Sequence, residues 1–242
     1  DPPQAGGDPT LVMFKSGDDL RQDQMTLQML RIMNQIWLDA GLDMCMTLYS
    51  CISTGDELGM LEVVTNSETT AGIQKQHGKL GALSARSLYI WLQEANPGKN
   101  FGMVVDNFVH SCAGYCVATY VMGIGDRHSD NIMIKRDGRL FHIDFGHFLG
   151  HFKSKFGVKR ERAPFVFTKE MAFVMGGKSD EPYKRFVELC CLAFNCLRHQ
   201  ASTLITMFKL MIPAGMPELR GVADIQYLCD KLALDKSDKE AA

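Results

Sequence analysis

The sequence predicts an α+β protein in which a small mixed lobe precedes a larger, mainly helical lobe. Short apolar runs flank one long amphipathic stretch before residue 66, whereas helical periodicity dominates after residue 67. A hairpin pattern is embedded in the helical part, and no internal repeat is visible. The 242 residues are 46% hydrophobic and 22% charged, which is enough to build one or two compact lobes.

The small lobe is expected to begin with a strand and a helix. Leu11 to Lys15 is a short apolar run that ends in a lysine, and the acidic turn after it can cap the helix that follows. This helix is expected to continue to about Ala40, where Gly41 ends it. Two further strands are expected at Met44–Cys51 and Met60–Val64, separated by a Gly55-Asp56 turn.

The larger lobe is expected to consist of helices around one hairpin. Helical spacing is present around residues 86–94 and 101–122 and over most of 168–232. Two short strands, Asn131–Ile134 and Leu140–Ile143, are joined by an Asp137-Gly138 turn. We therefore divide the chain into a disordered Pro/Gly-rich tail (1–10), a partial small lobe with a hinge (11–66) and the helical lobe (67–242).

Composition excludes several classes of function. The net charge of −2 gives no overall field that would attract nucleic acid. The eight cysteines form no Cys-x-x-Cys pair or zinc-type spacing, and Cys112 and Cys116 fall in an apolar helical stripe, so they are expected to be free core thiols. Free thiols suit a reducing, cytoplasmic compartment. No apolar run reaches the ~18–20 residues that span a bilayer, so a membrane would be contacted from outside.

Residues suited to phosphoryl transfer flank the predicted hairpin. Asp126, His128 and Asn131 lie at the start of its first strand, and Asp144 and His147 follow its second strand. An antiparallel hairpin brings these two loops to the same end. Carboxylate and amide oxygens are the ligands that Mg²⁺ prefers, and a nearby base can receive the proton of an attacking hydroxyl. Protein kinases also separate an Asp and an Asn by five positions and add an Asp-Phe-Gly motif.

Four segments together resemble the catalytic core of phosphoinositide 3-kinases. These are FKSGDDLRQD (14–23), SCAGY (111–115), VMGIGDRHSDN (121–131) and FHIDFGH (141–147). The resemblance extends from about Leu11 to the end of the chain. It implies a two-lobed protein-kinase-like fold with a truncated small lobe, which uses ATP and Mg²⁺. The family's upstream phosphate loop and its last C-terminal amphipathic helices are not found in this sequence, so the isolated chain is expected to be weakly active or inactive.

The resemblance assigns the nucleotide site to five residues. Lys15 would contact the ATP phosphates, and Asp23 and Tyr49 would line the inner nucleotide pocket. Glu62 and Val64 would be hinge residues whose backbone binds adenine.

The resemblance also assigns the catalytic residues. Asn131 and Asp144 would hold Mg²⁺, Asp126 would position the reacting groups, and His128 and His147 are candidates for proton transfer and charge stabilisation. Arg127 is expected to be a structural ion-pair partner.

A basic loop follows the Asp-Phe-Gly motif, where kinases place the segment that meets the substrate. The segment from His151 to Arg162 contains five Lys or Arg residues and one acidic residue, Glu161. Such a cluster complements the phosphates of an inositol headgroup and an anionic leaflet. The headgroup contacts are therefore assigned to Lys153, Lys155, Lys159, Arg160 and Arg162.

The loop resembles that of class I enzymes, which act on phosphatidylinositol 4,5-bisphosphate. The later segments 162–168 and 211–219 resemble class II enzymes, so that class stays open. Two further hypotheses are a related large protein Ser/Thr kinase and a catalytically silent binding module. For the longer parent protein, the resemblance implies a regulatory adaptor subunit, a small GTPase and location at the inner leaflet of the plasma membrane.

Overall fold

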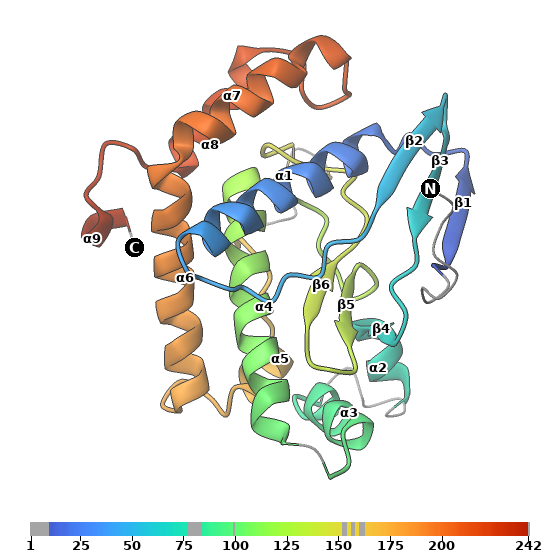
Figure 1. The fold of residues 1–242 in the computed structure, drawn as a ribbon, viewed down its shortest axis with the longest axis vertical. Helices are drawn as coiled ribbons and strands as arrows, with labels where there is room; N and C mark the ends of the chain where they lie inside the picture. The colour runs from blue at the N-terminus through green and yellow to red at the C-terminus, as the bar shows by residue number, and fades with distance from the viewer. Residues whose placement is uncertain are drawn as a thin grey trace, which may run out of the picture.

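The predicted α+β class is confirmed by the computed structural model, which describes residues 10–76, 84–98, 100–151, 154–155, 158–159 and 163–241. Short strands occur before residue 70 and again between residues 132 and 159, and helices form most of the remaining described chain (Figure 1). The buried apolar residues form a core cluster that includes side chains of both the strand-rich and the helical part. Among the described residues, no helix is long and apolar enough to cross a bilayer.

The small lobe is a three-stranded antiparallel sheet with one helix packed on it. Its elements are β1 (Val12–Ser16), α1 (Arg21–Asp39), β2 (Cys51–Gly55) and β3 (Leu58–Glu62), and the strand order is β1-β3-β2. Gly59 on the central strand faces Lys15 across the sheet. A Cβ at Gly59 would lie 2.5 Å from the carbonyl oxygen of Ile52 and 2.7 Å from Leu20, so only glycine lets the start of α1 approach this closely.

The expected strand Met44–Cys51 is wrong except at its last residue. Residues 43–50 have no regular structure, although Met44 is fully buried. Their backbone is held by side chains instead: the hydroxyl of Tyr115 donates to the carbonyl of Thr47 over 2.7 Å, and Arg31 donates to the carbonyl of Tyr49 over 2.9 Å. Met44 and Met46 pack where Gly114 leaves room on a long helix, so the alternating apolar pattern reflects contact with that helix.

The larger lobe contains most of the helices. Its elements are β4 (Ser67–Thr69), α2 (Thr70–Gln76), α3 (Ser87–Ala95), α4 (Phe101–Met122), β5 (Ile132–Lys135), β6 (Leu140–His142), β7 (Ser154–Lys155), β8 (Val158–Lys159), α5 (Lys169–Val174), α6 (Glu181–His199), α7 (Ala201–Met211), the 3₁₀ helix η2 (Ile212–Ala214), α8 (Val222–Lys231) and α9 (Asp238–Ala241). A second antiparallel sheet has the order β4-β5-β6, so the predicted hairpin is present with one further strand beside it.

Helix α4 is the buried axis of this lobe. It spans the expected residues 101–122 because the side chain of Asn100 caps its start and Gly123, with a φ of 58°, ends it. It packs against α6 and β6, and α4 and α6 lie side by side along the molecule (Figure 1). Cys112 and Cys116 are buried in this helix and are free, which confirms their expected core role.

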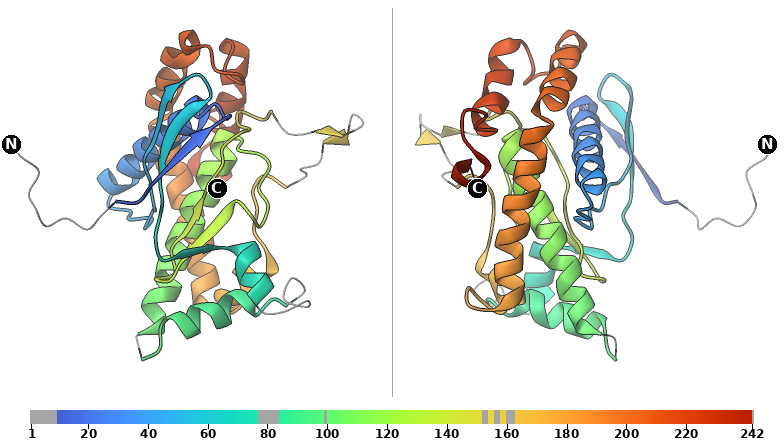
Figure 2. Two further views of the ribbon diagram at one scale, coloured as in Figure 1. Left: turned by 90° about the vertical axis from the view of Figure 1, so that its right-hand side faces the viewer. Right: turned by 60° about the vertical axis from the view of Figure 1, so that its left-hand side comes forward.

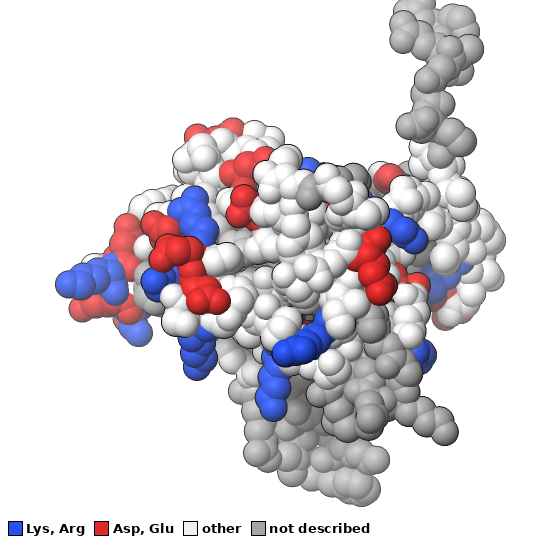
Figure 3. Space-filling model, turned by 90° about the horizontal axis from the view of Figure 1, so that it is seen from below, with Lys and Arg blue, Asp and Glu red and all other residues white. Residues whose placement is uncertain are grey.

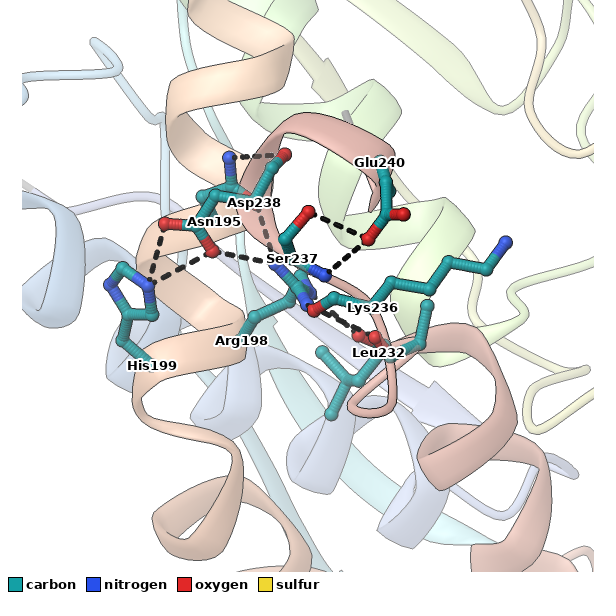
Figure 4. Close-up of polar contacts among 9 residues, drawn as sticks. Asn195, Arg198, His199, Leu232, Lys236, Ser237, Asp238 and Glu240 are labelled. Atoms are coloured by element: carbon teal, nitrogen blue, oxygen red, sulfur yellow. Dashed lines mark hydrogen bonds and ion pairs between the residues drawn. The ribbon is translucent and has the colours of Figure 1, made fainter.

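The C-terminal turn is fixed to α6 by one buried arginine (Figure 4). Arg198 donates hydrogen bonds to the carbonyls of Leu232 (2.9 Å) and Ala233 (3.0 Å) and to that of Lys236. It also forms an ion pair with Asp238 at 2.7 Å. The side chain of Arg198 is only 5% exposed, so its bonds to the carbonyls are largely shielded from water, whereas its partner Asp238 is half exposed.

Helix α1 connects the two lobes. The indole nitrogen of Trp37, a fully buried residue, donates to the carbonyl of Ala193 on α6 over 2.9 Å. The backbone N–H of Ser53 on β2 donates to the side chain of Gln24 over 2.8 Å. The helix therefore contacts the small sheet on one side and the helical lobe on the other.

Candidate active site

The two loops at the end of the β5–β6 hairpin are joined through Asn131. The side-chain oxygen of Asn131 accepts the backbone N–H of His128 at 2.9 Å, and its amide nitrogen donates to the carbonyl of Asp126 at 2.6 Å. The carbonyl of Asn131 accepts the N–H of Ile143, the residue before Asp144, at 3.1 Å. The expected convergence of these loops is therefore present. Asn131 lies at the centre of this contact and is only 3% exposed.

Arg127 fastens the same two loops through their backbones. Its guanidinium donates to the carbonyls of Gly125 (2.9 Å) and Ile143 (2.7 Å) and to that of Asp144. It also lies over the ring of Phe145, 5.5 Å from the centroid. Burial lowers the pKa of Arg127 even though Asp144 and Asp126 act in the opposite direction. Arg127 thus has a structural role, carried out by hydrogen bonds to carbonyls, whereas the ion pair expected for it stays a prediction.

A second set of backbone bonds closes the base of the site. The N–H of Gly125 donates to the carbonyl of His147 over 3.0 Å, and that of Leu149 donates to Met122 over 2.7 Å. The N–H of Gly150 donates to Gly123 over 3.2 Å. Residues 122–125 and 147–150 therefore run alongside each other, and the predicted acidic residues lie on the chain between them.

Asp126 and Asp144 both have left-handed backbone conformations, with φ values of 56° and 60°. Aspartate tolerates this region better than most residues, but the conformation is sparsely populated. Such residues persist where the surrounding structure fixes them, and they cluster at active sites. Here the hydrogen bonds from Asn131 and Arg127 to the carbonyls of Asp126 and Asp144 provide that fixation.

The residues present fit a magnesium ion bound together with phosphate oxygens. The amide oxygen of Asn131 has a second lone pair beyond the one that accepts the N–H of His128. Asp144 is exposed, and its hydrogen bond with Arg127 uses the backbone carbonyl, not the carboxylate. Among the described residues no cluster of three or more His, Cys, Asp or Glu could hold a metal ion by itself. Two protein oxygens completed by water and nucleotide phosphates are typical of Mg²⁺.

The start of α1 faces this loop. The carboxylate of Asp23 accepts the backbone N–H of Phe145 at 2.9 Å, and Gln22 donates to the carbonyl of Phe145 over 3.0 Å. Burial raises the pKa of Asp23 to about 6, opposed by the hydrogen bond from Phe145 and assisted by the negative charge of Asp144. Asp23 is therefore buried against the Asp-Phe-Gly loop, and its assignment to the inner nucleotide pocket stays a prediction.

Lys15 lies on β1 and is influenced by the same acidic residues. Its ammonium pairs with Asp18 at 2.5 Å. Partial burial lowers its pKa, but the hydrogen bond and charge of Asp18, with smaller effects of Asp144 and Asp23, outweigh burial and raise the pKa. Lys15 thus remains charged and lies near Asp18, Asp144 and Asp23, and its assigned contact with the ATP phosphates stays a prediction.

The other predicted nucleotide residues occupy different environments. Tyr49 is 3% exposed, and burial with the nearby charge of Asp23 raises its pKa, so its hydroxyl stays protonated. Glu62 is paired with Ser50, whose carbonyl accepts its N–H at 2.8 Å and whose N–H donates to its carboxylate at 2.9 Å. The carbonyl of Val64 accepts the hydroxyl of Ser67 at 2.7 Å. The adenine contacts assigned to Glu62 and Val64 stay predictions.

His128 and His147 lie on different sides of the joined loops. His128 lines a cavity of about 220 Å³ together with Thr70, Gln74 and Glu170, between the catalytic loop and α2. His147 is 29% exposed, and its Nδ1 lies 2.7 Å from a carboxylate oxygen of Glu218. The structure therefore places the two candidate proton-transfer groups in separate environments.

Glu218 and Gln22 were not identified from the sequence. Glu218 lies between η2 and α8, 71 residues from His147, and Gln22 lies on α1, 123 residues from Phe145. No spacing rule connects positions so far apart in one sequence. The local sequence Pro217-Glu218-Leu219 indicates only a loop between two helices.

The predicted headgroup loop is described only in part. Lys155 ends β7 and Lys159 ends β8, and these strands pair with Ser154 opposite Lys159. Figure 2 shows this short ribbon standing away from the helices. Lys153, Arg160 and Arg162 lie outside the described residues, and the assignment of all five cations to the headgroup stays a prediction.

Comparisons with known proteins agree with the motifs. Residues 9–221 match the family described as phosphatidylinositol 3- and 4-kinase. The chain is 53% identical over 238 residues to "Phosphatidylinositol 3-kinase 1" of Dictyostelium discoideum and 55% identical over 236 residues to "Phosphatidylinositol 3-kinase 2" of that organism. It is 50% identical over 239 residues to the human protein "Phosphatidylinositol 4-phosphate 3-kinase C2 domain-containing subunit beta".

Each match covers 97% of this chain but only 13–15% of the relative. The chain therefore corresponds to a small part of much longer proteins, and the matched part contains the paired catalytic loops described above. Because the family match and these identities span nearly all of its length, the chain belongs to the phosphatidylinositol 3- and 4-kinase family.

Proposed function

We propose that the protein carrying this chain is a lipid kinase that transfers the γ-phosphate of ATP to the 3-hydroxyl of the inositol ring of a phosphoinositide. The observation that carries the proposal is the joining of the Asp126–Asn131 loop to the Asp144–His147 loop at one end of a hairpin. Dictyostelium and human relatives at 50–55% identity are named as phosphatidylinositol 3-kinases or 3-kinase subunits, which supports the choice of reaction.

Each residue of the site has a defined task in this reaction. Lys15 binds the phosphates of ATP, and Asn131 and Asp144 supply oxygen ligands for Mg²⁺. The ion would neutralise charge that develops on the transferred group. Asp126 orients the reacting groups, and His128 and His147 accept a proton or stabilise charge. Arg127 keeps the two loops at a fixed distance through its bonds to Gly125 and Ile143.

The proposed substrate is phosphatidylinositol 4,5-bisphosphate, with the 3,4,5-trisphosphate as product. The cations of segment 153–162 support a multiply phosphorylated headgroup, because Arg and Lys complement clustered phosphates. The name of the human relative contains phosphatidylinositol 4-phosphate, so the class II alternative has a specific observation in its favour. A related protein Ser/Thr kinase is a second alternative.

The proposed site of action is the inner leaflet of the plasma membrane, contacted from the cytoplasm. The basic segment 153–162 would meet the anionic surface, and a regulatory adaptor and a small GTPase are proposed for the parent protein. Figure 3 shows that basic and acidic side chains are scattered between larger uncharged areas over the described part of the face seen from below. That mixed face gives no electrostatic basis for binding nucleic acid, in agreement with the net charge of −2.

The deciding experiment measures transfer of label from γ-radiolabelled ATP by the intact protein. Vesicles would contain phosphatidylinositol, its 4-phosphate or its 4,5-bisphosphate as the only phosphoinositide. Label at the 3-position of the bisphosphate supports the class I proposal, whereas label restricted to the first two lipids indicates class II. Label found on protein alone would overturn the lipid-kinase proposal.

A paired substitution tests which residues recognise the headgroup. Replacing Lys159 and Arg160 with Ala is expected to reduce turnover of the bisphosphate far more than turnover of phosphatidylinositol. Lys184 and Arg185 form a matched Lys-Arg pair on the exposed face of α6, and their replacement controls for loss of two charges. Equal losses on both lipids would contradict headgroup recognition by this loop.

A further inference from the structure

Glu218 joins three segments that are distant in sequence. Its carboxylate lies 2.7 Å from Nδ1 of His147, accepts the backbone N–H of Phe148 at 2.7 Å and accepts the side-chain N–H of Gln22 at 3.3 Å. The side chain of Glu218 is 15% exposed. A carboxylate with this many donors, largely shielded from water, is held in one position more firmly than a surface acid.

The segment that carries Glu218 is itself fixed in the core. The flanking residues Met216 and Leu219 are 2% and 0% exposed, and they are paired through a backbone bridge. Gln22 adds a connection to α1, because its side-chain nitrogen also donates to the carbonyl of Phe145. Glu218 is therefore positioned by the turn before α8 and by Gln22 of α1, and it contacts the loop that carries His147 through both the ring of His147 and the backbone of Phe148.

The bond to Glu218 determines which imidazole nitrogen carries the proton. An ionised carboxylate only accepts hydrogen bonds, so Nδ1 of His147 must donate. In the neutral ring the other nitrogen, Nε2, then has a free lone pair and can accept a proton. The same carboxylate holds the backbone of Phe148, the next residue, so both the ring and its main chain are oriented by one group.

We propose that Glu218 is a positioning residue that presents Nε2 of His147 to the attacking hydroxyl of the inositol ring. This inference rests on the proposed lipid-kinase function. As the hydroxyl oxygen forms its bond to the γ-phosphorus, the bond from phosphorus to the leaving oxygen of ADP breaks, and the hydroxyl proton passes to Nε2. The imidazolium that results faces the negative charge of Glu218, which stabilises it until the proton is released to water.

The first test replaces Glu218 with Gln in the intact protein. The amide offers one oxygen where the carboxylate offered two to its three donors, so its own NH₂ then meets either Nδ1–H of His147 or the N–H groups of Phe148 and Gln22. We expect kcat for the lipid to fall by about 10- to 100-fold, which is part of the ~100- to 10,000-fold that a positioned general base contributes, with KM for ATP changed by less than about 2-fold. Glu188→Gln on the exposed face of α6 is the matched control and is expected to retain activity.

A double-mutant cycle separates positioning from a purely structural role. If Glu218 acts through His147, Glu218→Gln added to His147→Gln slows the reaction by less than about 2-fold. Multiplying effects of the two changes would overturn the proposal, as would wild-type kcat in Glu218→Gln.

Folding is checked by the affinity of each variant for an ATP analogue. If Glu218→Gln does not bind the analogue, Glu218→Asp replaces it, since this variant keeps the charge and withdraws it by one methylene. Wild-type kcat in Glu218→Asp would then overturn the proposal, whereas a loss of kcat that vanishes in the His147→Gln background supports it. Lipid phosphorylation by the wild-type protein is measured before any variant is compared. If the wild type does not phosphorylate lipid, the proposed function is wrong, and this result is distinct from a failure of the Glu218 proposal.

Discussion

Asp23 makes the folded protein less stable as the pH rises through the slightly acidic range. Its pKa is about 6 in the folded chain, against an ordinary value of 3.8, because burial disfavours the charged form. The folded state therefore binds more protons than the unfolded state between these values, and the free energy of unfolding falls as the pH rises through 6. At about 1.4 kcal/mol per pH unit, the limiting contribution is roughly 3 kcal/mol.

The perturbation is Asp23→Asn, measured against wild type. The Asn side-chain oxygen can still accept the N–H of Phe145, but it does not titrate. We expect the wild type to lose about 1.3 kcal/mol relative to the variant between pH 5 and pH 7, as follows from the two pKa values. Histidines titrate in the same range in both proteins, so the difference between the two cancels their effect.

Urea unfolding provides the assay, with the fluorescence of Trp37 and Trp91 as the probe and with no metal or nucleotide present. Trp37 links α1 to α6 and therefore reports on the helix that carries Asp23. The m-values of the two proteins must agree for the comparison to hold. Asp39→Asn, at the exposed end of the same helix, controls for removal of one charge from α1. A difference between wild type and Asp23→Asn that stays constant from pH 5 to 7 would refute the reasoning.

Three further predictions concern stability and metal dependence. Arg198→Lys is expected to lower the free energy of unfolding by about 3 kcal/mol, since lysine cannot donate to several carbonyls at once. The control Arg185→Lys, on the exposed face of α6, is expected to lower it by less than about 0.5 kcal/mol. Equal urea midpoints for the two variants would contradict this prediction. Gly123→Ala is expected to cost more than about 2 kcal/mol, because its Cβ would lie 2.6 Å from a backbone nitrogen. Gly215→Ala measures the backbone strain alone, since Gly215 shares the left-handed conformation (φ 66° against 58°) but has open space around the added Cβ. Asp144→Asn is expected to reduce Mg²⁺-dependent phosphoryl transfer at least ~100-fold. Its urea midpoint is expected to be unchanged, because Asn also tolerates the left-handed conformation of this position. If the variant retains activity throughout a magnesium titration, Asp144 is not a ligand of the metal.

Much of the fold follows from local patterns. The bounds predicted for helix α4 agree with the observed ones because its apolar periodicity is long; the structure adds that Asn100 and Gly123 cap its ends. The hairpin was predicted within one or two residues from two short apolar runs around a turn. The prediction of a strand at 44–51 is wrong because Met44 and Met46 pack beside Gly114 of α4 and not in a sheet. The alternating apolar pattern of a single sequence is the same in both cases.

The candidate site likewise contains contacts that a local motif predicts and contacts that it does not predict. Asp126, His128 and Asn131 lie within six residues, so their meeting is a local property that a motif can carry. Their approach to Asp144 required only the hairpin. Glu218 reaches His147 across 71 residues through the packing of the turn before α8, and no short-range pattern encodes that contact.

The attachment of α1 on both sides has a consequence for motion. The N–H of Ser53 is bonded to Gln24, that of Phe145 to Asp23, and the indole N–H of Trp37 to the carbonyl of Ala193. Any rotation of the small sheet that carried α1 with it would have to break bonds to both the Asp-Phe-Gly loop and α6. Nucleotide exchange is therefore expected to occur by bending of the β1–β3–β2 sheet over a stationary α1. Hydrogen exchange would then be slow at the amide of Phe145 and faster at the amide of Ser53, the point at which the sheet leaves the helix.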